Sequence, residues 1–218
     1  MKKVLKTLAI ILLIFAIVLA SLVVWQWGNI KVLLTSVRYA TETIDTMVVE
    51  NKEHINQALN ELTDVNMREL NDEEREKLLS GELSEEEAVK VIMNMPEGQQ
   101  QSDDKVDDII SRIYLLRAEY ISRLSTLEKD ARAKGKAALK QKISISERLS
   151  LIETYTGKAA ALEKECDARM KSLIKELENE LKRLGKDTGI VSDVREYYET
   201  EKKLKKSQLL SKYSKYLK

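Results

Sequence analysis

The stretch LIETYTGKAAALEKECDARMKSLIKELENELKRL, residues 151–184, decides the fold of this chain. Its apolar residues recur at spacings of 4, 4 and 3, and this pattern is repeated three times. Eleven residues in three turns is about 3.67 residues per turn, so the apolar stripe stays on one side of a straight helix. We therefore predict a long helix with a core stripe made of Leu151, Tyr155, Ala159, Leu162, Cys166, Met170, Leu173, Leu177, Leu181 and Leu184.

Cys166 is the only cysteine of the chain and one member of this stripe. A reactive cysteine needs an electropositive setting that stabilises the thiolate, whereas Glu165 and Asp167 flank this one. We predict a packing residue. A disulfide between two copies and a reactive thiol are the alternatives.

Two further long helices are expected around the stripe. Ser144 and Glu147 form a capping box at the start of the stripe helix, Gly185 ends it, and another helix runs from about Val191 into the tail. Upstream, a helix that weakens near Gly135 carries an apolar face at Val106, Ile109, Ile113, Leu116, Tyr120, Leu124, Leu127 and Ala131. Because short loops join antiparallel neighbours, we predict an antiparallel bundle or long hairpin over 105–218.

A short acidic helical hairpin is predicted over 71–95. Asn71 or Asp72 caps its first helix, and Ser84 with Glu87 forms a capping box for the second. The hairpin does not suit DNA, because DNA affinity comes mostly from neutralising phosphates with basic residues.

The polar residues 96–104 form the linker that follows the acidic hairpin. Before the hairpin, residues 29–70 are predicted to form one amphipathic helix like a stalk. Its heptad seam is Ile30, Leu34, Val37, Thr41, Ile44, Val48, Asn51, Ile55, Ala58 and Leu62. On such a seam Asn51 either fixes the register or the oligomeric state of the helices, or lies at a solvated helix edge.

The N-terminal 28 residues read as a transmembrane signal-anchor. An uncharged run from Leu8 to Val24 follows three lysines and precedes Trp25 and Trp27. A span needs about 20 apolar residues, with positive charge on the cytoplasmic side and aromatic residues at the interface. We expect a bacterial cell-membrane protein with a cytoplasmic N-terminus and an extracytoplasmic bulk. Cleavage of a signal peptide after Ala20 is the alternative.

The net charge of +1 conceals an asymmetry along the chain. Residues 41–108 carry 20 acidic and 6 basic side chains, and residues 109–218 carry 16 and 26. The two halves attract each other, so the chain either folds back on itself or pairs head to tail with a copy. A protein partner or self-association is therefore expected.

The tail after Glu201 is purely basic. We predict contact with an anionic surface, either lipid or a phosphate-rich wall polymer, through Lys202, Lys203, Lys205, Lys206, Lys212, Lys215 and Lys218. The alternative is that these lysines complement the helix dipole and the acidic hairpin. Nucleic acid is not an expected partner, because of the predicted location.

No motif for catalysis is found. His54 is the only histidine, so the usual zinc ligands cannot be assembled within one chain, and we expect a solvated helix residue there. The carboxylate runs lack the glycine-turned loop of a calcium site. Phosphate loops, dinucleotide fingerprints and nucleophile elbows are missing as well. We therefore predict no catalytic, cofactor-binding or metal-binding residues, no cofactor and no enzymatic activity.

The C-terminal third, AAALEKECDARMKSLIKELENELKRLGKDTGIVSDVREYYETEKKLKKSQLLSKY, residues 159–213, resembles the closing segment of bacterial membrane-anchored helical proteins of coiled-coil-like pattern. The resemblance implies an alternation of helix and loop, and it implies no activity.

These patterns predict an all-α protein in which a transmembrane helix continues into a stalk helix, a short hairpin and a long antiparallel bundle or hairpin. The expected function is that of a non-enzymatic, single-pass interaction or scaffold protein of the bacterial envelope. Two alternatives stay open: an extracytoplasmic sensory or ligand-binding bundle that works with a separate membrane partner, and a secreted helical adaptor or chaperone.

Overall fold

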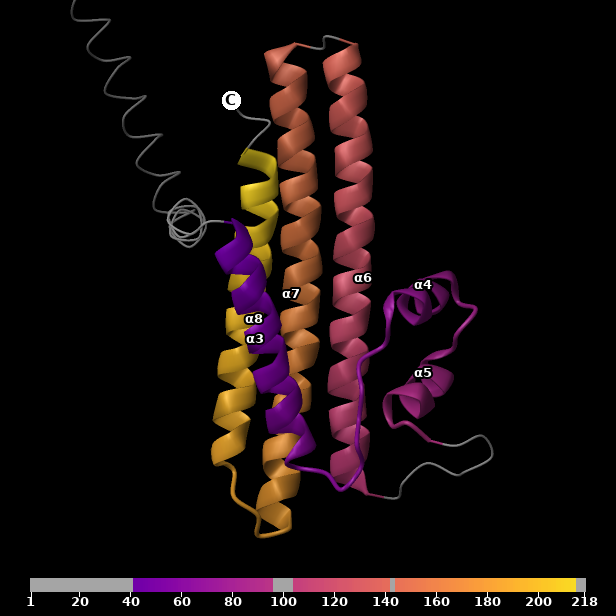
Figure 1. Ribbon diagram of the computed structural model, residues 1–218, viewed down its shortest axis with the longest axis vertical. Coiled ribbons are helices and arrows are strands. Elements are labelled where there is room, and N and C mark those ends of the chain that lie inside the picture. The colour runs from indigo at the N-terminus through magenta and orange to yellow at the C-terminus, as the bar shows by residue number, and fades with distance from the viewer. Residues whose placement is uncertain (1–40, 96–103, 142–143, 215–218) are drawn as a thin grey trace, which may run out of the picture. The chain divides into compact units, whose positions relative to one another are not determined.

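The structure is a computed structural model that describes residues 41–95, 104–141 and 144–214 (Figure 1). Over these ranges the chain forms six helices, α3 to α8, and no strand. The predicted all-α class is therefore confirmed for the part of the chain that the structure describes. The predicted transmembrane segment and most of the predicted linker lie outside these residues.

Contacts along the backbone divide the chain into two compact units. Of the described residues, unit 1 contains 41–55 and 196–214, and unit 2 lies within Asn56–Arg195. Two helices cross the boundary, namely α3 (Thr41–Asn60) and α8 (Gly189–Ser214). Unit 2 holds four complete helices: α4 (Asp72–Ser80), α5 (Glu85–Ile92), α6 (Lys105–Lys140) and α7 (Ile145–Arg183).

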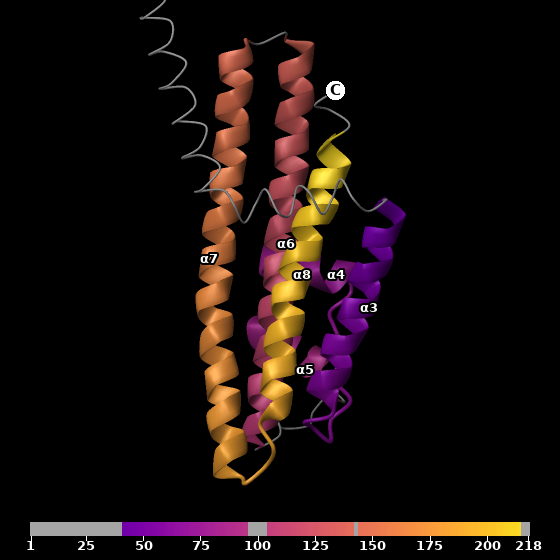
Figure 2. The same ribbon diagram turned by 90° about the vertical axis from the view of Figure 1, so that its left-hand side faces the viewer.

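In unit 1, α3 lies beside α8 (Figures 1 and 2). Asn51 Nδ2 donates to the Tyr197 carbonyl at 3.0 Å, and Gln208 Nε2 donates to Asp45 Oδ1 at 2.6 Å. The α8 number falls as the α3 number rises, so the two segments are antiparallel. Asn51 is buried, 7% exposed, and its side chain binds the facing helix rather than solvent.

Helix α3 ends at Asn60, ten residues before the end of the amphipathic helix predicted over 29–70. The polar residues at this point bind the backbone outside a helix, which ends the helix locally. Asn60 Nδ2 donates to the Met67 carbonyl at 3.3 Å, and the Val65 amide donates to Thr63 Oγ1 at 3.0 Å. Residues 61–70 are therefore a non-helical segment, which we call the strap.

The strap is fixed inside unit 2 at several points. Met67 and Leu70 are buried, and the Arg68 amide donates to the Ile92 carbonyl at 2.9 Å, at the end of α5. Thr63 Oγ1 also donates to the carboxylate of Asp107, a buried residue in the first turn of α6. Apolar burial and paired polar groups thus hold the strap against both α5 and α6.

Arg117, in the middle of α6, has a side chain that is only 3% exposed. Its Nη1 donates to Asn56 Oδ1 at 3.0 Å, and its Nη2 lies 3.3 Å from Glu69 Oε1 on the strap. The guanidinium carbon lies 5.9 Å from the ring centre of Tyr114. One buried cation therefore joins the end of α3, the strap and α6.

The acidic hairpin, residues 71–95, contains the helices α4 and α5. Asn71 with Glu74, and Ser84 with Glu87, form capping boxes at the two helix starts. A bidentate pair with Arg68, at 2.8 and 2.7 Å, lowers the pKa of Glu74. Gly81 ends α4 in the left-handed region at φ 78°, which only glycine adopts at low cost.

Helices α6 and α7 form a long antiparallel hairpin. Asp104 Oδ1 accepts from the Val106 amide at 2.8 Å at the start of α6, and the predicted capping box of Ser144 with Glu147 opens α7. Helix α6 continues through Gly135 to Lys140. A glycine inside a helix costs about 1 kcal/mol relative to alanine, which the rest of a 36-residue helix offsets.

Ion pairs along the edges set the register of this hairpin. Arg112 binds Glu176 at 2.7 Å, and Arg123 binds Glu165 through two bonds of 2.7 and 2.9 Å. Arg169 of α7 binds Glu119 of α6 at 2.6 Å. Eleven residues forward on α6, from 112 to 123, correspond to eleven residues back on α7, from 176 to 165.

The core stripe is buried in its second half and half-buried in its first. The structure buries Leu162, Cys166, Met170, Leu173, Leu177 and Leu181. The half-buried members are Leu151, Tyr155 and Ala159. Leu184 departs from the prediction: α7 ends at Arg183, Leu184 is its C-cap, and its side chain is 42% exposed.

Leu177 and Leu184 offer a matched test of the core, because they are the same residue type in the same predicted stripe. Leu177→Ala is expected to lower the free energy of unfolding by about 3 kcal/mol, since a fully buried leucine leaves a cavity. Leu184→Ala is expected to change it by less than about 0.5 kcal/mol. Urea unfolding of the full chain in mild detergent, followed by circular dichroism, measures both, and equal losses would contradict this core.

Arg117 and Glu69 offer a test of the buried pair. Arg117→Met is expected to cost up to about 3 to 5 kcal/mol, because it leaves the half-buried carboxylate of Glu69, 17% exposed, without its cation. Adding Glu69→Met should recover most of that loss, because two apolar side chains replace the pair. The same unfolding measurement decides, and a double variant as unstable as Arg117→Met alone would show that the pairing is not what holds the strap.

Candidate interaction surfaces

The described residues contain no group of three or more histidine, cysteine or acidic side chains placed to hold a metal ion. His54 is exposed, and its ring centre lies 5.5 Å from that of Tyr197 within unit 1.

Cys166 lies in the α6–α7 interface and is 3% exposed. The cavity beside it, about 10 Å³, holds no more than one water molecule. A disulfide between two copies at this position would require the two helices to separate. The thiol is placed as a packing residue is.

Arg117 and the residues around it, Asn56, Glu69 and Tyr114, form a largely buried cluster that was not predicted from the sequence. Its signal was a single arginine in the otherwise apolar run YLLRA, residues 114–118. Burial raises the pKa of Tyr114 to about 12. The neutral ring of Tyr114 therefore packs against the guanidinium of Arg117.

The predicted basic tail does not present all its lysines alike. Lys202 is buried: its Nζ lies 4.8 Å from the ring centre of Tyr198 and 3.1 Å from Glu199 Oε1. Lys203 is exposed, whereas Lys205 and Lys206 are half-buried. The side chain of Lys212, and the whole of Lys215 and Lys218, lie outside the described residues.

The far end of the α6–α7 hairpin, residues 124–141 and 144–160, is a thin two-helix segment that we call the arm. Among its described side chains only Ala138 is buried, and the seam between the helices is otherwise half-buried. Within unit 2, α4 and α5 lie beside the other half of α6 (Figure 1). The arm therefore extends beyond the packed part of unit 2.

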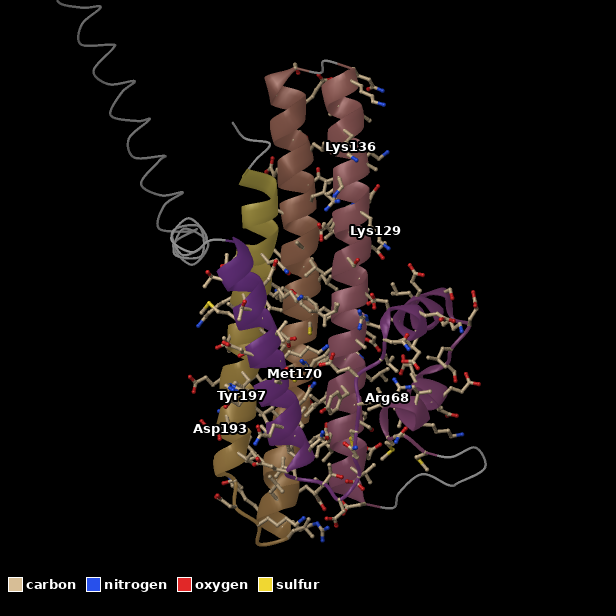
Figure 3. All side chains as sticks on the ribbon, in the orientation of Figure 1. Arg68, Lys129, Lys136, Met170, Asp193 and Tyr197 are labelled. Atoms are coloured by element: carbon tan, nitrogen blue, oxygen red, sulfur yellow. The ribbon has the colours of Figure 1, made fainter. Side chains whose placement is uncertain are left out.

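One side of the arm is basic. Lys129, Arg132, Lys136 and Lys140 follow one another at spacings of 3, 4 and 4, which places them along one side of α6, and we call them the basic face. All four are exposed, and a shallow hollow runs between the first three. Figure 3 labels Lys129 and Lys136 on α6, beyond the acidic hairpin.

The acidic hairpin meets the near end of the basic face. Residues 71–95 carry eight acidic and three basic side chains, and residues 124–141 carry two and five. Glu76 Oε1 lies 3.5 Å from Lys129 Nζ. Glu82, Glu85 and Glu86 around the α4–α5 turn are exposed. The acidic hairpin was predicted from the sequence. The basic face was not, although the helical spacing of its four cations indicates it.

No protein-family model matches the sequence, and the comparisons with curated proteins and with solved structures find no match.

Tyr114 gives a pH dependence that tests the interior cluster. Between pH 10 and about 12 an unfolded tyrosine loses its proton while Tyr114 keeps it, so the folded state binds more protons and stability falls as pH rises. Tyr114→Phe should remove a slope of up to about 1.4 kcal/mol per pH unit in that window. Urea midpoints of both proteins across the window measure it, and parallel pH profiles would mean that this hydroxyl is not buried.

Proposed function

We propose that this chain is a non-enzymatic, single-pass interaction or scaffold protein of a bacterial envelope, with the helical part outside the cytoplasm. The apolar run from Leu8 to Val24, preceded by lysines and followed by tryptophans, supports the anchor. In this proposal the helices described above bind a protein partner or a second copy.

The geometry of the arm is the main support for the proposed interaction role. Two long helices are held in one register by paired charges, and their far half buries little of its own surface. A straight helical pair of this kind projects a defined surface away from its base, as coiled-coil spacers do. That geometry suits docking better than it suits chemistry, which needs a concave site with converging polar groups.

Within residues 41–95, 104–141 and 144–214, no helix combines the length and apolar character required to cross a membrane. The proposed span falls in residues 1–28, outside these ranges. The anchor therefore rests on the sequence pattern, and it is the first part of the proposal to test.

The anchor predicts how the full chain behaves in cells. The protein should stay in the membrane through alkaline extraction, keep Met1 by intact mass, and lose its helical part to protease added outside spheroplasts. Leu13→Arg with Phe15→Arg should release it, because a charge at the centre of a span costs about 2.5 to 3.5 kcal/mol. Leu13→Ile with Phe15→Leu, which keeps the run apolar, should remain anchored.

Two results would contradict the anchor. A mature chain that begins at Ser21 would indicate a cleaved and released protein, and full protection from external protease would place the helices on the cytoplasmic side.

A further inference from the structure

We propose that the basic face of the arm binds the acidic hairpin of a second copy of this chain. The inference deepens the interaction role proposed above by naming the partner. It does not depend on membrane insertion.

One contact between the acidic hairpin and the basic face already exists within a single copy. Glu76 of α4 lies 3.5 Å from Lys129, the first cation of the basic face. The side chains of Glu76 and Lys129 are 77% and 72% exposed, so this pair is a surface contact at the edge of the hairpin. The acidic hairpin and the basic face therefore already form one ion pair within a single copy.

Within one copy, the acidic hairpin contacts only the near end of the basic face. At about 1.5 Å per residue, Lys136 and Lys140 lie about 10 and 16 Å farther along α6 than Lys129. The acidic hairpin is fixed at the base of the arm by the buried Leu70, by the bond from the Arg68 amide to Ile92, and by the Arg68–Glu74 pair. The acidic hairpin of the same copy therefore does not reach Lys136 and Lys140, whereas the same hairpin of a second copy is free to do so.

A second copy of the chain carries an acidic surface that can meet Lys136 and Lys140. Glu82 and Glu86 are exposed at the α4–α5 turn, and residues 71–95 have an excess of five negative charges over eight acidic and three basic side chains. Residues 124–141 have an excess of three positive charges over five basic and two acidic ones. Opposite potentials on the two surfaces steer two copies into contact and reject a parallel pairing of like surfaces.

The contact joins two different surfaces of the chain. Two copies related by a two-fold axis make it twice, in an isologous interface, and a head-to-tail arrangement makes it once per pair, in a heterologous interface. Individual exposed ion pairs are weak, so the association is expected to be salt-sensitive.

The test combines crosslinking of isotope-labelled chains with charge-reversal variants. Full-length chains grown in natural and in ¹⁵N medium are purified in mild detergent, mixed, and treated with a zero-length carbodiimide that couples amines to carboxylates. Mass spectrometry should find mixed-isotope peptides that join Lys136 or Lys140 to Glu82, Glu85 or Glu86. Their yield should fall about tenfold or more between 0.05 and 1 M salt, because the Debye length shrinks to about 3 Å at 1 M.

Charge reversal then tests the partners directly. Lys136→Glu with Lys140→Glu should weaken self-association about tenfold or more, and Glu82→Lys with Glu86→Lys should do the same. An equimolar mixture of the two variants should restore association, because each supplies the charge that the other lost. Lys171→Glu with Lys175→Glu, an equal charge change at exposed positions of α7, should leave it unchanged. Circular dichroism verifies that every variant keeps its helices.

Three results would overturn the proposal: no mixed-isotope crosslinks at low salt, crosslinks from the acidic hairpin only to tail lysines such as Lys203, or no rescue in the mixture. None of them bears on membrane anchoring, so the wider function stands or falls separately.

Discussion

The buried guanidinium of Arg117 is the interaction on which the arrangement of unit 2 depends. A charge removed from water is costly unless it is paired, and here Glu69 and Asn56 provide the partners from two other segments. The strap has no helix or strand of its own, so its position depends on this pair together with the buried Met67 and Leu70 and the bond from the Arg68 amide to Ile92. Because the strap leads directly into α4, the cation that orders it also fixes where the acidic hairpin begins.

Charged side chains thus have two separate roles in this molecule. Inside unit 2, Arg117 fixes the position of the strap. Along the exposed edges of α6 and α7, arginine and glutamate pairs at residues 119, 123, 165 and 169 align the two helices next to the arm, where the apolar seam becomes half-buried. Exposed pairs contribute little to stability, but a displaced register would bring like charges together, so they contribute specificity.

Sequence periodicity predicted the helices well and their surroundings less well. The capping boxes predicted at Ser84 and Ser144 form, and Asn71, one of two candidate caps, forms a capping box as well, because capping depends on residues within one turn. The end of α3 at Asn60 was missed, because it depends on side chains that bind a strap ordered by distant contacts. Likewise, the pattern alone could not distinguish Lys202, buried against Tyr198, from its exposed neighbour Lys203.

The ion pairs between α6 and α7 have the same spacing on both helices, and this spacing determines which insertions and deletions leave the hairpin interface intact. Arg112 and Arg123 are eleven residues apart, as are their partners Glu176 and Glu165, and eleven residues are close to three whole turns. Removing or inserting eleven residues in both helices together returns every later side chain to the same orientation. Descendants of this gene can therefore alter the reach of the hairpin in increments of about 16 Å without redesigning its interface.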